Sequence, residues 1–181
     1  MPKDAVLTYA DVDYFNNNRK DARAARDQRP VQYPSTKAAY HAFQAMRNQT
    51  EIQRRDKAMF AFAMITCARA GAISSLRLIH INLVDGYVFQ DGRNVRTKAG
   101  KTIKTFFFPM HPDYLACFTA WVEYLRNDKM FGPEDALFPT PARRLVDGKF
   151  CFDTLSRDIY ASGAQLSGVF AKAFRDVQMH P

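Results

Sequence analysis

The sequence predicts an α/β fold of the α+β type, a mostly helical domain with a small three-stranded antiparallel sheet. Residues 51–68 include a stretch that is apolar on all sides, which is typical of a helix buried inside a domain. After Gly86 the pattern changes to short runs of β-branched and aromatic residues bounded by Asp-Gly pairs, which is typical of strands and turns. Helical periodicity returns from Pro112.

Composition indicates one globular domain with its own core. The chain has 181 residues, of which 47% are hydrophobic and 24% charged. Its longest uncharged run, residues 159–171, is shorter than the roughly 20 residues of a membrane span, and no secretory signal opens the chain. Cys67, Cys117 and Cys151 are odd in number and lie far apart, which argues against a disulfide scaffold. We therefore expect a soluble, cytoplasmic protein.

Residues 1–34 are predicted to be a tail and linker in front of the domain. Thr8 can cap a short helix over residues 10–15. Residues 19–34 are charged, poor in large apolar side chains and contain two prolines. The domain is therefore expected to cover residues 35–181.

Capping residues mark where the helices begin. Ser35 or Thr36 precedes the first helix, and Thr50 with Gln53 has the spacing of a capping box in front of the second. Gly71 is expected to end that second helix. The predicted helices cover residues 36–48, 51–68, 72–78, 112–127, 154–160 and 167–177.

One face of the helix over residues 112–127 is predicted to pack on the core, and it carries Leu115, Phe118, Val122 and Leu125. Residues 131–143 contain three prolines and are predicted to form a loop. The strands are predicted at residues 87–89, 95–97 and 103–108, with residues 98–101 as a hairpin connection.

Charge gives the first indication of a partner. Lys and Arg number 26 against 18 Asp and Glu, a formal net charge of +8. Such an excess is compatible with a polyanion such as nucleic acid, and also with a soluble basic protein that binds none. One segment holds five basic residues and no acidic one: Arg93, Arg96, Lys98, Lys101 and Lys104.

Two cations stand out as candidate site residues. Arg69 follows an uncharged stretch at the end of a buried helix, where its guanidinium can bind phosphate or carboxylate oxygens, or instead cover the last carbonyls of the helix. Lys98 lies at the tip of the predicted hairpin, where it can reach a nucleic-acid groove or remain solvated. The residues alone do not decide between these alternatives.

Metal and cofactor chemistry has no support in the sequence. The four histidines show no ligand spacing, and no phosphate-binding or dinucleotide-binding glycine motif occurs. We expect no metal and no small-molecule cofactor. Phe106, Phe107 and Phe108 can form a base-stacking platform or pack under a sheet.

Three segments together resemble the catalytic domain of tyrosine recombinases, the phage integrase family. Residues 66–69 (Thr-Cys-Ala-Arg), followed by Leu76-Arg77 and the strand entry at residues 81–83, resemble its first arginine box. Residues 96–101 (Arg-Thr-Lys-Ala-Gly-Lys) resemble its hairpin lysine segment, and residues 136–139 (Ala-Leu-Phe-Pro) resemble the stretch before its last helices. The resemblance covers roughly residues 33–181.

The resemblance implies a role in DNA integration or recombination on a phage or other mobile element. In that family a tyrosine attacks a DNA phosphodiester and forms a phosphotyrosine, two arginines stabilise the transition state and a lysine protonates the leaving oxygen. Arg69 corresponds to the first arginine and Lys98 to the general acid. The DNA contacts implied beside them are Arg77, Arg93, Arg96, Lys101 and Lys104.

The sequence also departs from the family pattern. Ala72 stands where the family has an acidic residue, and the chain ends at Pro181, where a His-x-x-Arg box and the tyrosine nucleophile are expected to follow. Tyr160 precedes that position and is not expected to be the nucleophile. We therefore expect this chain to bind double-stranded DNA without cleaving it.

Two alternatives remain. One is a non-catalytic DNA-binding or protein-interaction remnant that regulates a full-length recombinase, with a homo-oligomer or that recombinase as partner. The other is an unrelated RNA-binding module, which requires an exposed Phe106 or Phe107.

Overall fold

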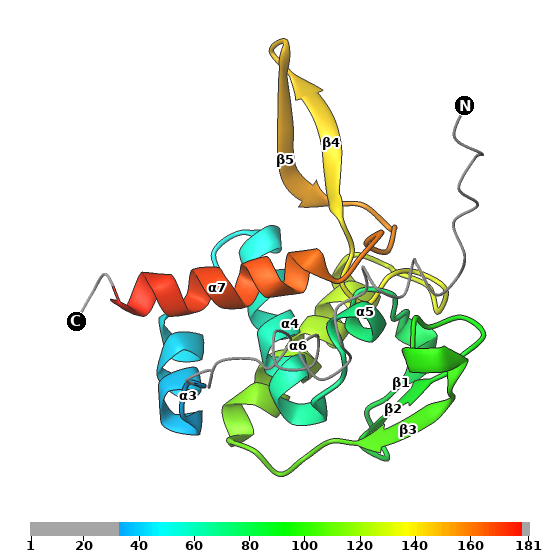
Figure 1. The fold of residues 1–181 in the computed structure, drawn as a ribbon. Helices are drawn as coiled ribbons and strands as arrows, with labels where there is room; N and C mark the ends of the chain where they lie inside the picture. The colour runs from blue at the N-terminus through cyan, green and yellow to red at the C-terminus, as the bar shows by residue number, and fades with distance from the viewer. Residues whose placement is uncertain (1–32, 179–181) are drawn as a thin grey trace, which may run out of the picture. The chain divides into compact units, whose positions relative to one another are not determined.

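The computed structural model describes residues 33–178, and the chain divides between Pro34 and Ser35 into two units. The second unit, which begins at Ser35, contains all the helices and strands named here (Figure 1). The short helix expected over residues 10–15 lies outside the described residues. No helix among the described residues is long and apolar enough to cross a membrane.

Five α-helices form most of the second unit. They are α3 (Thr36–Ala45), α4 (Glu51–Thr66), α5 (Ala70–Ile73), α6 (Pro112–Glu123) and α7 (Ala164–Gln178). A π-helical turn, Tyr124–Asp128, extends α6, and two 3₁₀ turns lie at Leu78–His80 and Lys98–Gly100.

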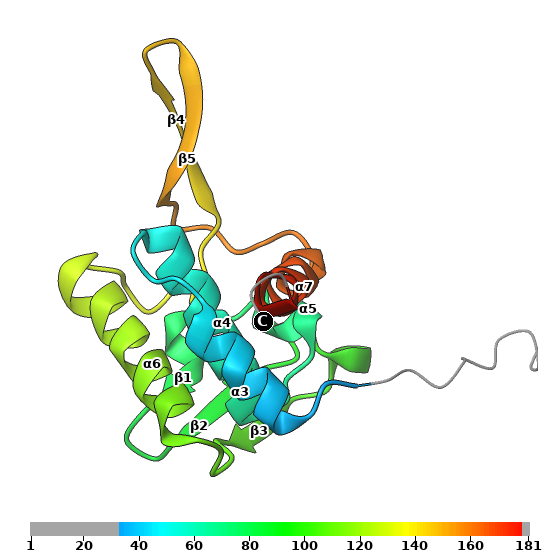
Figure 2. The same ribbon diagram turned by 90° about the vertical axis from the view of Figure 1, so that its left-hand side faces the viewer.

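Helix α4 passes through the core, as its apolar sequence predicts. The Thr50 hydroxyl accepts a hydrogen bond from the Gln53 amide, and the Gln53 side chain accepts one from the Thr50 amide, so the predicted capping box is confirmed. The Phe60 ring stacks on Phe170 of α7 at 4.3 Å, and Phe62 contacts Phe118 of α6 at 4.8 Å between ring centroids. Helix α4 is thus packed against α6 and α7 (Figure 2).

The end of α4 differs from the prediction. Cys67, in the left-handed conformation with φ 49°, ends the helix, and Gly71 lies inside α5. The Thr66 hydroxyl donates to the Phe62 carbonyl and accepts from the Ala68 amide, which stabilises the turn. The helix expected over residues 72–78 is replaced by α5, which begins earlier, and by the 3₁₀ turn that starts at Leu78.

The three-stranded antiparallel sheet is confirmed, with strands β1 (Ile81–Asn82), β2 (Tyr87–Gln90) and β3 (Ile103–Phe106) in the order β1-β2-β3. The strand expected over residues 95–97 was wrong. That segment lies in the β2–β3 connection, where the Asn94 and Val95 amides donate to the Asp91 carbonyl and fold the chain back. The short β1 takes its place in the sheet.

A two-stranded hairpin, β4 (Pro141–Val146) and β5 (Lys149–Leu155), projects from the helices (Figures 1 and 2). The helix expected over residues 154–160 was wrong, because β5 continues through Leu155 and the Tyr160 amide then donates to the Ser74 carbonyl. Asp147 and Gly148 both have positive φ and form the turn. The Asp147-Gly148 pair is a strong sequence signal for a hairpin at this position.

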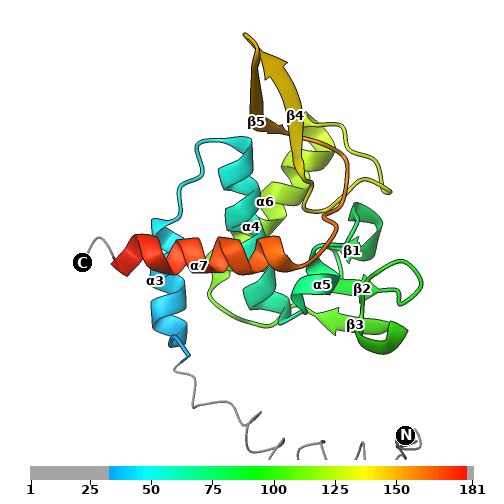
Figure 3. The ribbon, with the colours of Figure 1, turned by 45° about the horizontal axis from the view of Figure 1, so that its top comes forward.

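Helix α7 runs across α3 and α4 and also contacts α5 (Figure 3). Through α5, which begins next to Arg69, the helical core supports the segment that carries this candidate site residue.

Candidate functional site

Arg69 lies on the surface, at the turn between α4 and α5. The turn that begins at Cys67 brings the chain out of the core, and Arg69 occupies the N-cap of α5. Its guanidinium makes no hydrogen bond or ion pair to any residue in the range 33–178. Ala72, three residues further on, is buried and carries no charge to neutralise it. The guanidinium is therefore open to an external anion.

Lys98 begins the 3₁₀ turn within the β2–β3 connection, residues 91–102. It is exposed, but it does not lie between the two short strands that the sequence predicted. The connection is compact instead: a Cβ on Gly92 would lie 2.0 Å from the Gly100 carbonyl oxygen, and the Gly92 amide donates to the Thr102 hydroxyl. This folding holds Lys98 at a defined place relative to the sheet.

One cavity of about 260 Å³ brings Arg69 and Lys98 together. Strands β2 and β3 contribute Gln90 and Thr105, whose side chains are hydrogen-bonded at 3.2 Å. The Thr97 hydroxyl also lines the cavity, and it is buried without a hydrogen-bond partner among the described residues. Two cations, several hydroxyls and an amide thus line a space that suits a small anionic group.

Two other predicted DNA contacts, Arg77 and Arg93, line a different cavity of about 620 Å³. Arg77 donates to the Glu134 carbonyl. Arg93 forms an ion pair with Asp91 at 2.6 Å. These two arginines therefore have partners within the protein and are separate from the Arg69–Lys98 cavity.

The Asp91–Arg93 pair predicts a pH dependence of stability. Hydrogen bonds from the Arg93 side chain and amide lower the pKa of the Asp91 carboxyl to about 2. A lowered folded-state pKa stabilises the fold above the unfolded value of about 3.9, and this contribution is lost as the pH falls toward 2. We expect Asp91→Asn to lower the urea midpoint at pH 7, with the difference from wild type narrowing between about pH 4 and pH 2.

The control for that comparison is Asp153→Asn, which removes the exposed Arg144–Asp153 pair of the hairpin. An equal loss of stability for Asp91→Asn at every pH would contradict the expectation.

The three remaining predicted contacts differ from one another. Arg96 directs its guanidinium toward main-chain carbonyls of Ser74, Tyr160 and Ala161. Lys101 is exposed and has no side-chain partner among the described residues. The Lys104 amino group lies 3.8 Å from the centre of the Tyr87 ring.

Beside Lys104, Phe106 is 58% exposed, whereas Phe107 packs edge-on against Phe118. The exposed Phe106 meets the condition that the RNA-binding alternative requires.

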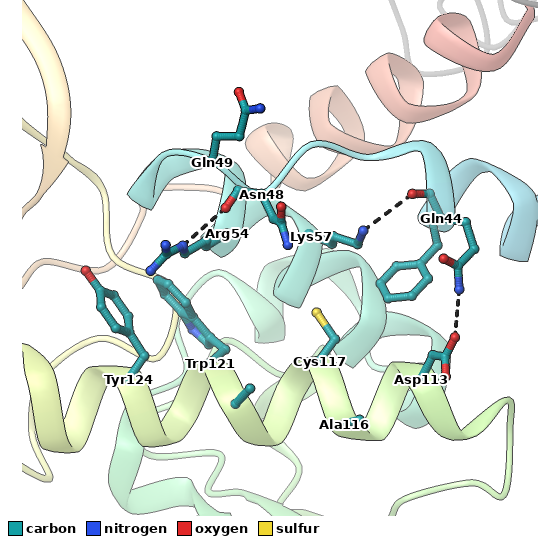
Figure 4. Close-up of a pocket in the computed structure, with 12 residues that line it drawn as sticks. Gln44, Asn48, Gln49, Arg54, Lys57, Asp113, Ala116, Cys117, Trp121 and Tyr124 are labelled. Carbon is teal, nitrogen blue, oxygen red and sulfur yellow. Dashed lines mark hydrogen bonds between the residues drawn. The ribbon is translucent and has the colours of Figure 1, made fainter.

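The largest of these cavities, about 730 Å³, lies elsewhere, between α6 and the segment from Gln44 to Lys57 (Figure 4). No predicted site residue lines it. Burial raises the pKa of its Cys117 thiol, and burial together with the hydrogen bond to Glu51 raises the pKa of Tyr124 to about 12. Neither group is thus activated as a nucleophile. The sequence signal for this cavity is a stripe at helical spacing, formed by Asp113, Cys117 and Ala120 of α6 and by Tyr124 of the π-helical turn that extends it.

Within residues 33–178, no three His, Cys, Asp or Glu side chains gather as a metal site requires.

The helices and the three-stranded sheet form a fold that is similar to that of a recombinase domain. Among solved structures, the chain is similar to that described as the crystal structure of XerA recombinase, with a TM-score of 0.55 and 14% sequence identity. The similarity covers 85% of this chain and 46% of the XerA chain, so this chain corresponds to about half of that protein. No family model and no curated protein matches the sequence.

Proposed function

We propose that this chain is a DNA-binding part of a site-specific tyrosine recombinase that acts in DNA integration or recombination. The observation that carries the proposal is the shared cavity of Arg69 and Lys98, which come from different segments of the sequence. The recombinase-like fold supports the same conclusion. Under this proposal, residues 35–181 act as part of a recombinase catalytic domain, and residues 1–34 act as a linker.

Electrostatics explains how such a cavity would hold a DNA phosphate. The planar Arg69 guanidinium can donate two parallel hydrogen bonds to non-bridging oxygens, whereas the Lys98 ammonium acts as a compact charge beside them. Lys101 and Lys104 extend the positive charge along the β2–β3 connection and β3. In a complete enzyme Arg69 would stabilise the transition state and Lys98 would protonate the leaving oxygen.

We also propose that this 181-residue chain does not cleave DNA by itself. None of the described tyrosines lines the Arg69–Lys98 cavity. Tyr160 is buried beneath the Arg55 guanidinium, and burial raises the pKa of its hydroxyl, which disfavours the nucleophilic phenolate.

The test is fluorescence anisotropy with a labelled DNA duplex at several salt concentrations. If Arg69, Lys98, Lys101 and Lys104 each contact a phosphate, log K should fall against log salt with a slope of about −3 to −4. Arg69→Ala and Lys98→Ala should each weaken binding and reduce the slope by about 1. Arg175→Ala, an exposed position in the last turn of α7, removes the same charge and should change neither.

Binding that does not depend on salt would contradict the proposal. So would Arg69→Ala and Lys98→Ala variants that behave like Arg175→Ala. Preference for a single-stranded RNA competitor over the duplex, lost in Phe106→Ala, would favour the RNA-binding alternative instead.

A second candidate function is association with a recombinase chain of the same fold, which would regulate it. Leu145 pairs with Phe150 across the hairpin, and Phe152 lies two residues further along β5. All three are exposed, which favours association. Sedimentation velocity tests this: a strictly monomeric chain contradicts it, and self-association that Phe150→Ser abolishes supports it.

A further inference from the structure

Arg96 links the β2–β3 connection, residues 91–102, to the rest of the domain. Because this connection carries Lys98, we call it the Lys98 loop. We propose that Arg96 is a positioning residue that holds Lys98 beside Arg69, and that it does not itself contact DNA. This inference rests on the proposed function for the role of Lys98, whereas the contacts of Arg96 are independent of it.

Arg96 is exposed, yet both terminal nitrogens of its guanidinium donate to the protein's own main chain. Nη1 donates to the Ala161 carbonyl at 2.5 Å, and Nη2 donates to the carbonyls of Tyr160 and Ser74, the latter at 3.3 Å. The Arg96 amide donates to the Ser75 hydroxyl at 2.9 Å. A guanidinium engaged by several carbonyls has few donors left for a phosphate.

Two partners of Arg96, Ser74 and Ser75, lie at the end of the α5 segment, which Arg69 begins. Ser74 follows α5, and the hydroxyls of both Ser74 and Ser75 donate to the Gly71 carbonyl at 2.9 and 3.1 Å. Helix α5 has four residues and cannot persist without such contacts. The Arg96 side chain and amide thus bind the loop directly to the α5 segment.

The segment before α7 provides the third support. The Tyr160 amide donates to the Ser74 carbonyl at 3.2 Å. A Cβ on Gly163 would lie 2.7 Å from the backbone carbon of Ala70, so this segment lies directly on α5. Because α5 is also held from this side, loss of Arg96 should leave α5 in place and release mainly the Lys98 loop. Lys98 lies two residues after Arg96 and should move with that loop.

Hydrogen exchange tests the positioning role without DNA. In Arg96→Ala the amides of residues 97–101 should exchange on the order of tenfold faster, because charge-assisted hydrogen bonds that close the loop are lost. Arg96→Lys keeps the positive charge but loses the planar set of guanidinium donors, and it should give an intermediate rate of hydrogen exchange. The control Lys101→Ala removes one charge from the same loop, where Lys101 has no described partner, and should leave the rates unchanged.

A double-mutant cycle in DNA affinity separates positioning from direct contact. If Arg96 acts through Lys98, Arg96→Ala should lower the DNA affinity of the wild-type chain. In the Lys98→Ala background the same substitution should lower the DNA affinity less than about twofold. If Arg96 instead contacted a phosphate independently, Arg96→Ala would lower the DNA affinity by the same factor in both backgrounds. Should Arg96→Ala fail to fold, Arg96→Gln replaces it in both measurements.

The outcomes distinguish the two proposals. Unchanged exchange of residues 97–101 in Arg96→Ala, or additive losses of affinity, would overturn the positioning role. Faster exchange in a chain that binds no duplex would leave the positioning of the loop intact and refute the proposed DNA-binding function.

Discussion

Replacing Phe118 by alanine is expected to destabilise the domain by about 3–5 kcal/mol, the range found when a large aromatic side chain is removed from a packed core. The Phe118 side chain is 0% exposed. Its ring neighbours those of Phe62 and Phe138, which also lie beside each other, and Phe107 of the sheet segment is edge-on to it. The cavity left by alanine would therefore open where α4, α6 and the sheet segment meet.

Urea unfolding at neutral pH measures this change, and Leu115→Ala provides the matched control. Leu115 lies one turn earlier on the same helix and is 44% exposed, although the sequence predicted it on the core face. We expect Leu115→Ala to cost about 0.5 kcal/mol or less. Equal losses for the two variants would contradict the packing described for α6. Since whole domains have only about 5–15 kcal/mol of stability, Phe118→Ala should leave a marginal fold.

Gly92→Ala should have the second largest effect, because the added Cβ would clash with backbone rather than with a movable side chain. It would lie 2.0 Å from the Gly100 oxygen, 2.5 Å from the Gly100 carbonyl carbon and 3.0 Å from the Lys101 carbonyl carbon. The two sides of the β2–β3 connection must then separate. We expect a loss of about 1–3 kcal/mol in urea unfolding, as for other overpacking substitutions, and faster hydrogen exchange over residues 93–101.

Gly168→Ala is the control for that substitution. A Cβ at Gly168 meets nothing within 4 Å, and the residue lies inside α7. Alanine there should stabilise the domain by about 0.5–1 kcal/mol, since glycine is a poor helix former. If Gly92→Ala were as stable as the wild type, the close approach of Gly92 and Gly100 would be refuted.

Local signals in the sequence predicted the helices better than the strands. The capping box at Thr50 and the apolar character of residues 51–68 depend on neighbouring residues, and both are confirmed. The strand expected over residues 95–97 failed because the Asp91 carbonyl competes for the amides there. Strand β1 has two residues, too few for a periodic pattern, and it exists because β2 pairs with it.

The candidate site, like the fold, could be predicted from the sequence only in part. The sequence selected Arg69 and Lys98, and the structure brings both to one cavity, although their chemical roles remain predictions. Sequence alone could not predict the position of Arg96, because its partners are main-chain carbonyls of Ser74, Tyr160 and Ala161, which any residue type provides. Only the tertiary fold distinguishes an arginine that binds its own backbone from one that faces solvent.

The closed base of the β4–β5 hairpin makes this segment an exchangeable module. The hydroxyls of Thr140 and Ser156 are hydrogen-bonded at 2.7 Å, and the Ser156 amide donates to the Thr140 carbonyl, so the chain leaves the domain and returns to it at the same point. Leu155 at the base is buried in the core and its amide donates to Glu51 of α4, but insertions, deletions or a replacement sequence within the outer part of the arm, residues 143–153, need not move α4, α5 or the Lys98 loop. Evolution can therefore vary the length and surface of this arm independently of the Arg69–Lys98 cavity, and a reporter group can be attached there for the same reason.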